Sequence, residues 1–128
     1  MIAGRLYLVG GRTVQGGAMA RLDRYDPKTD VWESLAPLPQ ASGGLAAAAL
    51  GGRLYAFGGE WFGPSGAGVY GETWVYDPRS DVWSAGPRML TPRHGLAGTA
   101  VDGVVLALGG ARRASAADTS DLVEALRA

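Results

Sequence analysis

Two copies of one stretch decide the fold: Tyr25-Asp26-Pro27-Lys28-Thr29-Asp30-Val31-Trp32 and, 51 residues later, Tyr76-Asp77-Pro78-Arg79-Ser80-Asp81-Val82-Trp83. A glycine doublet recurs in step with them, at Gly10-Gly11, Gly58-Gly59 and Gly109-Gly110, and each doublet ends a short apolar run. A period of about 50 residues, with glycine, tyrosine and tryptophan at fixed offsets, is typical of the blades of a β-propeller. The repeat therefore predicts an all-β protein built from successive blades.

The composition fits a single folded domain and argues against two classes of partner. Hydrophobic residues make up 47% of the 128 residues, and 21 glycines imply many turns between short strands. Twelve basic residues balance 12 acidic ones, so no excess of positive charge is available for nucleic acid or for an anionic membrane surface. The absence of cysteine excludes a disulfide framework, a thiolate metal site and a cysteine nucleophile.

The first residues read as a strand and not as a targeting segment. Residues 4–9, Gly-Arg-Leu-Tyr-Leu-Val, resemble the internal segment 52–57, Gly-Arg-Leu-Tyr-Ala-Phe, and no basic leader precedes them. We therefore expect no signal peptide and a cytoplasmic location. No apolar run approaches the ~20 residues of a membrane-spanning helix.

The second repeat predicts four strands. They are expected at residues 44–50, 53–57, 72–76 and 82–85, and the run of small residues at 44–50 suits a strand crowded near a propeller axis. Gly51-Gly52 and, one period later, Asp102-Gly103 are expected to form tight hairpin turns. Residues 60–71, which contain several glycines, are expected to form a loop after the Gly58-Gly59 doublet. Tyr76 and Trp83 recur at constant offsets, which favours packing between blades over a role in chemistry.

The order of apolar strand, Gly-Gly, loop, Tyr-Asp-Pro and Trp resembles the kelch repeat over nearly the whole chain. A WD-type repeat is disfavoured because its period is ~40–45 residues and it requires a Trp-Asp pair. The resemblance implies four-stranded antiparallel blades around a central channel. It also implies that binding residues lie on the loops at one end of that channel.

The strand count predicts a partial propeller. We expect an incomplete first blade at residues 1–35, a complete second blade at 43–85 and an incomplete third blade at 94–128. The tail after Asp118 could form a helix or a third strand, and we prefer a strand with Leu126 in the position of Tyr76. Three explanations stay open: the chain is the C-terminal part of a longer propeller, which we favour; it closes a ring with copies of itself through its open blade edges; or it stands alone.

Trp61 and Phe62 are adjacent in the predicted loop after the second glycine doublet. Exposed aromatic side chains there could anchor a partner, or they could fold back over the blade. Arg93-His94 is expected to begin the third inner strand, where the matching residues one period earlier are Ser42-Gly43. By resemblance to kelch proteins, an arginine there would face the channel mouth and bind carboxylate or carbonyl groups, and a purely structural role is as good an expectation.

Four other arginines could join the same rim, namely Arg12, Arg88, Arg112 and Arg113. The residues that we nominate for partner binding are Arg12, Glu60, Trp61, Phe62, Arg93 and His94.

No set of residues indicates a reaction. One histidine and no cysteine cannot build the copper site of galactose oxidase, which has a kelch propeller, and no nucleophile–base–acid set or phosphate loop stands out. The alternative is a fragment of a carbohydrate-processing kelch enzyme. It would resemble sialic acid mutarotases, with Arg93 and Glu60 in the channel, or galactose oxidase without its copper site. We expect a non-enzymatic protein-interaction module or scaffold, with a protein partner and without metal, cofactor, nucleic acid or membrane.

Overall fold

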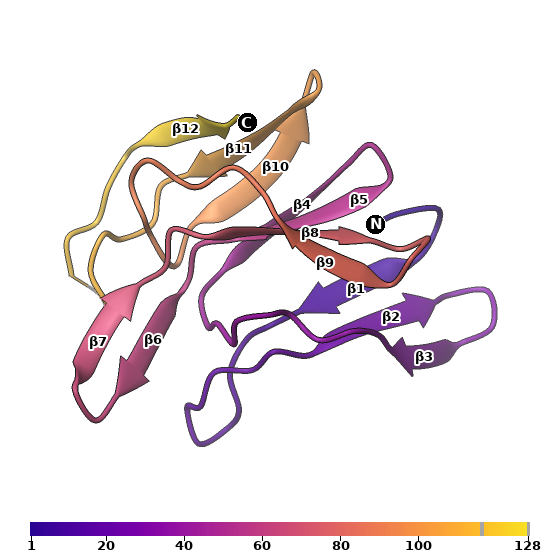
Figure 1. Ribbon diagram of the computed structural model, residues 1–128, viewed down its shortest axis with the longest axis horizontal. Helices are drawn as coiled ribbons and strands as arrows, with labels where there is room; N and C mark the ends of the chain where they lie inside the picture. The colour runs from indigo at the N-terminus through magenta and orange to yellow at the C-terminus, as the bar shows by residue number, and fades with distance from the viewer. Residues whose placement is uncertain (116, 128) are drawn as a thin grey trace.

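The computed structural model describes residues 1–115 and 117–127, and all regular structure in them is β (Figure 1). The strands, in chain order, are β1 (Leu6–Val9), β2 (Leu22–Asp26), β3 (Val31–Ser34), β4 (Ala46–Leu50), β5 (Arg53–Phe57), β6 (Glu60–Gly63), β7 (Gly66–Val69), β8 (Thr73–Asp77), β9 (Val82–Ala85), β10 (Ala97–Val101), β11 (Val104–Leu108) and β12 (Val123–Leu126). The all-β prediction is confirmed. Within the described residues, no helix is long and apolar enough to cross a membrane.

Three antiparallel sheets follow one another as blades, as Figure 1 shows. Blade 1 has the order β1-β2-β3, blade 2 the order β4-β5-β8-β9, and blade 3 the order β10-β11-β12. Only blade 2 has all four strands among the described residues, so the prediction of one complete and two incomplete blades is confirmed. A separate two-stranded sheet, β6-β7, extends from blade 2.

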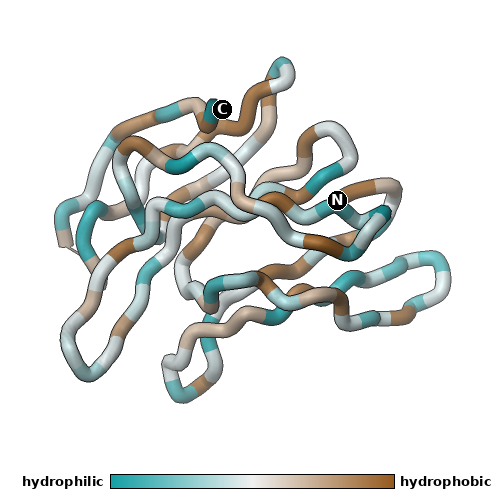
Figure 2. The backbone as a smooth tube through the Cα atoms, in the orientation of Figure 1, coloured by the Kyte–Doolittle hydropathy of each residue, from teal (hydrophilic) through white to brown (hydrophobic). Residues whose placement is uncertain are grey.

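The hairpin turns of the inner strands form as predicted. Gly51 and Gly52 have φ of 60° and 75°, and Asp102 and Gly103 have φ of 50° and 76°. Two consecutive residues with positive φ match the right-handed twist of the flanking strands, which is why glycine and aspartate occur there. Figure 2 shows that the turn between β2 and β3, which carries the Tyr-Asp-Pro motif, is by contrast strongly hydrophilic.

The expected loop at residues 60–71 is instead a β-hairpin, so that prediction is wrong. β6 pairs with β7 in register from Glu60 opposite Val69 to Gly63 opposite Gly66. The glycines made this segment look irregular, but Gly68 lies under the Trp61 ring, where a Cβ would come within 2.8 Å of Trp61 Nε1. The glycines thus allow an aromatic side chain to lie flat across the paired strand.

The inner strand of blade 3 begins at Ala97 and not at Arg93, which corrects a second expectation. His94 instead exchanges backbone hydrogen bonds with Ala111, and Gly95 N donates to Gly44 O of the preceding blade at 2.7 Å. This lead-in segment therefore bonds to the preceding blade through Gly95 and, through His94, to Ala111 in the register of the β10–β11 pair.

The tail forms the predicted strand. In β12, Leu126 pairs with Val105 of β11, just as Tyr76 of β8 pairs with Leu54 of β5. Leu126 is buried, so it occupies the tyrosine position of the repeat as expected.

Blades 1 and 2 are joined through the repeated motif. The Tyr76 ring is completely buried, with its centroid 5.1 Å from that of Trp83 and 6.2 Å from that of Tyr7 in blade 1. Trp83 Nε1 donates to Ala36 O at 2.8 Å, and Asp81 Oδ1 accepts from Ala36 N at 2.9 Å. Both side chains thus hold one residue of the linker that leaves blade 1, and the interpretation of Tyr76 and Trp83 as packing residues is confirmed.

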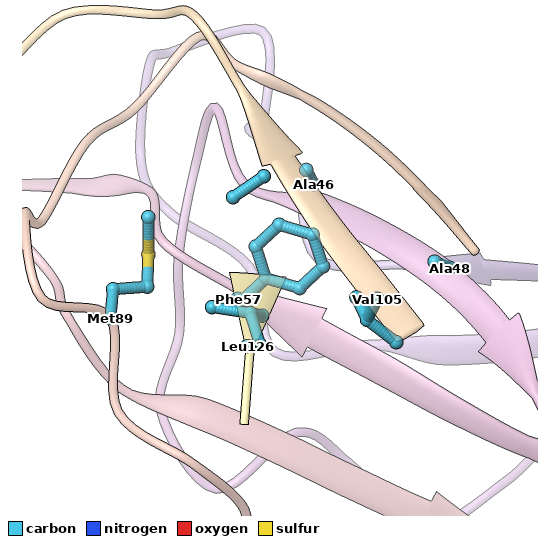
Figure 3. Close-up of a cluster of buried hydrophobic side chains, with 7 residues drawn as sticks. Ala46, Ala48, Phe57, Met89, Val105 and Leu126 are labelled. Carbon is cyan, nitrogen blue, oxygen red and sulfur yellow. The ribbon is translucent and has the colours of Figure 1, made fainter. Parts of the chain in front are cut away.

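Blades 2 and 3 share a second core, shown in Figure 3. Phe57, Met89 and Leu126 meet there, with Val105 and the small residues of β4 around them. Gly98 of β10 has no room for a side chain, because a Cβ would lie 2.6 Å from Phe57 Cζ. Small residues are therefore required where β4 and β10 approach each other.

The glycine doublets mark the crossing points between blades. Gly58 and Gly59 have φ of 69° and 104°, and a Cβ on Gly58 would lie 2.5 Å from the carbonyl oxygen of Arg93. Gly59 N donates to that same oxygen at 3.0 Å. The lead-in segment of each following blade thus rests directly on the doublet of the blade before it.

Candidate functional site

Glu60 ties together the loops of all three blades. It is the first residue of β6, its side chain is only 4% exposed, and one carboxylate oxygen accepts a hydrogen bond from Arg12 Nη2 of the β1–β2 loop. The other oxygen accepts from Ser115 N at 2.8 Å and lies 3.4 Å from His94 Nδ1. A buried carboxylate needs such partners, and here they come from three separate segments.

His94 extends this network into the β11–β12 loop. Its Nε2 lies 2.7 Å from Arg113 O, and its backbone exchanges two hydrogen bonds with Ala111. The nominated residues Arg12, Glu60 and His94 are thus brought together, although 48 residues separate Arg12 from Glu60. We call the surface around them, formed by the β1–β2 loop, the β6–β7 hairpin and the β11–β12 loop, the loop end.

The two nominated aromatic residues behave differently. Trp61 is half-buried because it packs across Gly68 of its own hairpin. Phe62, the next residue, points to the other face of the strand and is 57% exposed. Trp61 thus folds back onto its own hairpin and not over the blade, whereas Phe62 is exposed.

The Arg93 side chain does not join this cluster and is buried among other partners. It is 0% exposed, and Nη1 donates to Gly109 O at 2.7 Å and to Leu122 O at 2.9 Å. Nη2 forms an ion pair with Glu124 of β12 at 2.9 Å. These contacts bind β11 to β12, which is the structural role considered for this residue and places it away from an incoming ligand.

The other arginines of the expected rim are spread over separate pairs. Arg88 donates to Glu72 at 2.7 Å and Arg112 to Asp118 at 2.8 Å, while Arg113 contributes its backbone carbonyl to His94. Partial burial acts to raise the pKa of Glu72, but the hydrogen bond and charge of Arg88 together with backbone hydrogen bonds outweigh it, so that pKa is lowered. These arginines do not form one anion-binding cluster.

Sequence reasoning missed two contributors to the loop end. Val14, in the β1–β2 loop, is 98% exposed, and Ser115 supplies the backbone amide that Glu60 binds. Val14 is an apolar residue between polar neighbours in a loop, which is a usable signal for a contact residue. The role of Ser115 depends only on loop conformation and has no sequence signal.

The geometry does not assemble the residues that a sugar-processing site would use. Glu60 binds Arg12 and Ser115, whereas Arg93 binds Glu124, so the two residues belong to different hydrogen-bond networks. Among the described residues, no group of three or more His, Cys, Asp or Glu side chains is placed to hold a metal ion.

Comparisons with known proteins all point to one family. The kelch motif matches residues 1–39 and 41–90. The chain is 32% identical to mouse Kelch-like protein 35 over 108 residues, 84% of this chain and 17% of that protein. It is 33% identical to zebrafish Kelch-like ECH-associated protein 1B over 105 residues, 82% of this chain and 18% of that protein.

A third relative, which has a different name, is similar over much the same length, and a solved structure has the same fold. Alpha-scruin of Limulus polyphemus is 30% identical over 111 residues, which is 84% of this chain and 12% of that protein. The structure of YjhT superposes with a TM-score of 0.80 at 16% identity, covering 94% of this chain and 39% of that one, and so supports the fold. The chain spans less than a fifth of the length of these three relatives. With the motif matched over most of its length and three kelch-type blades in its structure, the chain belongs to the kelch-repeat family.

Proposed function

We propose that this chain is a protein-interaction module whose partner docks on the loop end. One observation carries the proposal: Glu60 fixes the loops of three blades, and two apolar side chains, Phe62 and Val14, are exposed on that fixed support. An exposed aromatic residue on a rigid element is a typical anchor at protein interfaces. The names of the relatives are consistent with this function, since one of them states an association and none of those reported above states a reaction.

We also propose that the chain is part of a larger propeller. Leu6 and Leu8 of β1 are exposed, whereas their counterparts in β5, Leu54 and Ala56, are buried, and Leu54 packs in a cluster with residues of blade 1. Trp32 is likewise 52% exposed, although its counterpart Trp83 is packed against the linker of blade 1. On the side of blade 1 that faces away from blade 2, residue positions that pack between blades elsewhere in the chain are thus exposed.

The interaction proposal is tested by site-specific crosslinking. A photoreactive phenylalanine analogue at position 62 is compared with the same analogue at position 101, in the β10–β11 hairpin at the opposite end of the strands. Val101 is also exposed, which makes it a matched control. In a lysate of the source organism, position 62 is expected to capture a protein that position 101 does not capture. Identical products at both positions would contradict docking on the loop end.

A further inference from the structure

The β6–β7 hairpin, which stands out from the blades in Figure 1, has an unpaired strand edge. β7 pairs with β6 on one side, and no other strand of the described residues pairs with it. Tyr70 N donates to Gly59 O at 2.8 Å, and backbone groups alternate in direction along an antiparallel strand. The amides and carbonyls of Ala67 and Val69 therefore point away from β6, toward the free side.

The sequence of β7 does nothing to block this edge. Proteins commonly block a free edge with a charged side chain, a proline or a bulge. β7 consists of Gly66, Ala67, Gly68 and Val69, so it carries neither charge nor proline, and its register with β6 runs without a bulge. The edge is thus open to the backbone of another extended segment.

An aromatic ring lies on each face of the hairpin beside this edge. Phe62 pairs with Ala67 across the strands and so shares its face, where the phenylalanine is 57% exposed. Trp61 lies on the other face, across Gly68, where a Cβ would come within 3.0 Å of the indole atoms Cε2 and Cζ2. Because the residues of β7 are small, a neighbouring strand would contact an apolar surface on both faces.

The edge is also held in place before a partner arrives. Glu60, the first residue of β6, binds Arg12 of the β1–β2 loop and Ser115 N of the β11–β12 loop. A preorganised edge needs no ordering of its own when it binds, which lowers the entropic cost of association.

We infer that an extended segment of the partner, with apolar side chains, adds to β7 as a third strand of this small sheet. Its backbone pairs with Ala67 and Val69, and its side chains pack alternately on the face of Phe62 and on the face of Trp61. The inference rests on the proposed function, because Phe62 of the loop end belongs to the same hairpin, and it states the form in which the partner docks.

The test is hydrogen exchange of the backbone amides, followed by nuclear magnetic resonance of the labelled full chain. It is measured with and without the protein that is captured at position 62. In the free chain, the amides of Gly68 and Tyr70 should exchange slowly, and those of Ala67 and Val69 fast. In the complex, Ala67 and Val69 should become protected by about tenfold or more, because both amides then donate to the added strand.

Two alanine-to-proline substitutions form a matched pair. Ala67→Pro removes an outward amide while the pairing of β6 with β7 is kept, because proline is tolerated at a strand edge, and it should weaken binding of the captured protein by about tenfold. Ala85→Pro makes the same change at the outer edge of blade 2: Gly86 N donates to Thr73 O, so the Ala85 amide points away from β8. This control should leave the affinity unchanged.

If Ala67→Pro disturbs the hairpin, an ester linkage in place of the Ala67 amide removes the same N–H without the proline ring, and the same loss of affinity is expected.

Four results would overturn the inference. Amides of Ala67 and Val69 that still exchange fast in the complex would do so and would leave docking on the loop end intact. Full affinity of a folded Ala67→Pro chain, or an equal loss with Ala85→Pro, would have the same meaning. Failure to capture any protein at position 62 would reject the proposed function as well. A free chain that sediments as a dimer, with Ala67 and Val69 already protected, would show that a second copy occupies the edge.

Discussion

Ser42 and Arg93 occupy the same position one repeat apart and make the same contact. Ser42 Oγ donates to Gly58 O at 3.1 Å, and Arg93 Nη1 donates to Gly109 O at 2.7 Å. Each carbonyl belongs to the first glycine of a doublet. The longer arginine side chain then reaches β12, where it pairs with Glu124.

Arg93→Ala is therefore expected to destabilise the chain strongly. The substitution removes the cation paired with Glu124, the side-chain donor to Gly109 O and one of the two donors to Leu122 O. Removing one partner of a buried ion pair costs about 3–5 kcal/mol. Ser42→Ala loses one neutral hydrogen bond, about 1 kcal/mol. Urea unfolding measures both, and a loss for Arg93→Ala no larger than for the exposed Arg79→Ala would contradict this role.

Removing the indole nitrogen of Trp83 should lower the stability of the chain, whereas removing that of Trp32 should not. Trp83→Phe keeps an aromatic ring but removes the hydrogen bond to Ala36 O, so the free energy of unfolding is expected to fall by about 1 kcal/mol or more. Trp32 occupies the same position in blade 1, where its ring is half-exposed, and Trp32→Phe should change stability little. Equal effects in urea unfolding would show that the link to Ala36 contributes nothing.

Gly98→Ala tests the close approach of β4 and β10. The added Cβ would lie 2.6 Å from Phe57 Cζ and 3.2 Å from Ala46 Cβ, and overpacking of this kind costs about 1–3 kcal/mol. Gly17→Ala is the control, since its nearest neighbour would be 3.5 Å away. A thermal melting temperature unchanged by Gly98→Ala would mean that the blades are less tightly packed than described.

Stability should depend on the charge of Asp81 at low pH. Hydrogen bonds from Ala36 N and then from the Tyr76 hydroxyl lower the pKa of Asp81 from its usual 3.8. A carboxyl group with a lowered folded-state pKa stabilises the fold above its unfolded pKa, and the stabilisation is lost as pH falls through the folded value. The advantage of the unmodified chain over Asp81→Asn should thus be full at pH 6 and shrink below about pH 4. Urea unfolding at several pH values checks this, and a difference independent of pH would contradict it.

The regular part of the fold could be predicted from the sequence because the repeat carries local information. The strands β5 and β8, the turn at Gly51-Gly52 and the strand at Val123–Leu126 follow from residue types at fixed offsets. The β6–β7 hairpin could not be predicted, because its glycines suggest a loop until the Trp61 ring is seen lying over Gly68.

The candidate site was predictable only as a set of residue types. Arg12, Glu60 and His94 were nominated singly, but their meeting depends on how three blades are placed next to one another. A structural role is one of two expectations for Arg93, but its pairing with Glu124 could not be predicted, because Glu124 lies 31 residues away in a tail without a repeat motif.

The most direct test of the proposed function is the affinity of the protein captured at position 62 for three chains: unmodified, Phe62→Ala and Val101→Ala. Removing a central aromatic anchor costs about 2 kcal/mol or more, so Phe62→Ala is expected to weaken binding by about thirtyfold while Val101→Ala leaves it unchanged. Equal affinities of the unmodified and Phe62→Ala chains would contradict docking on the loop end.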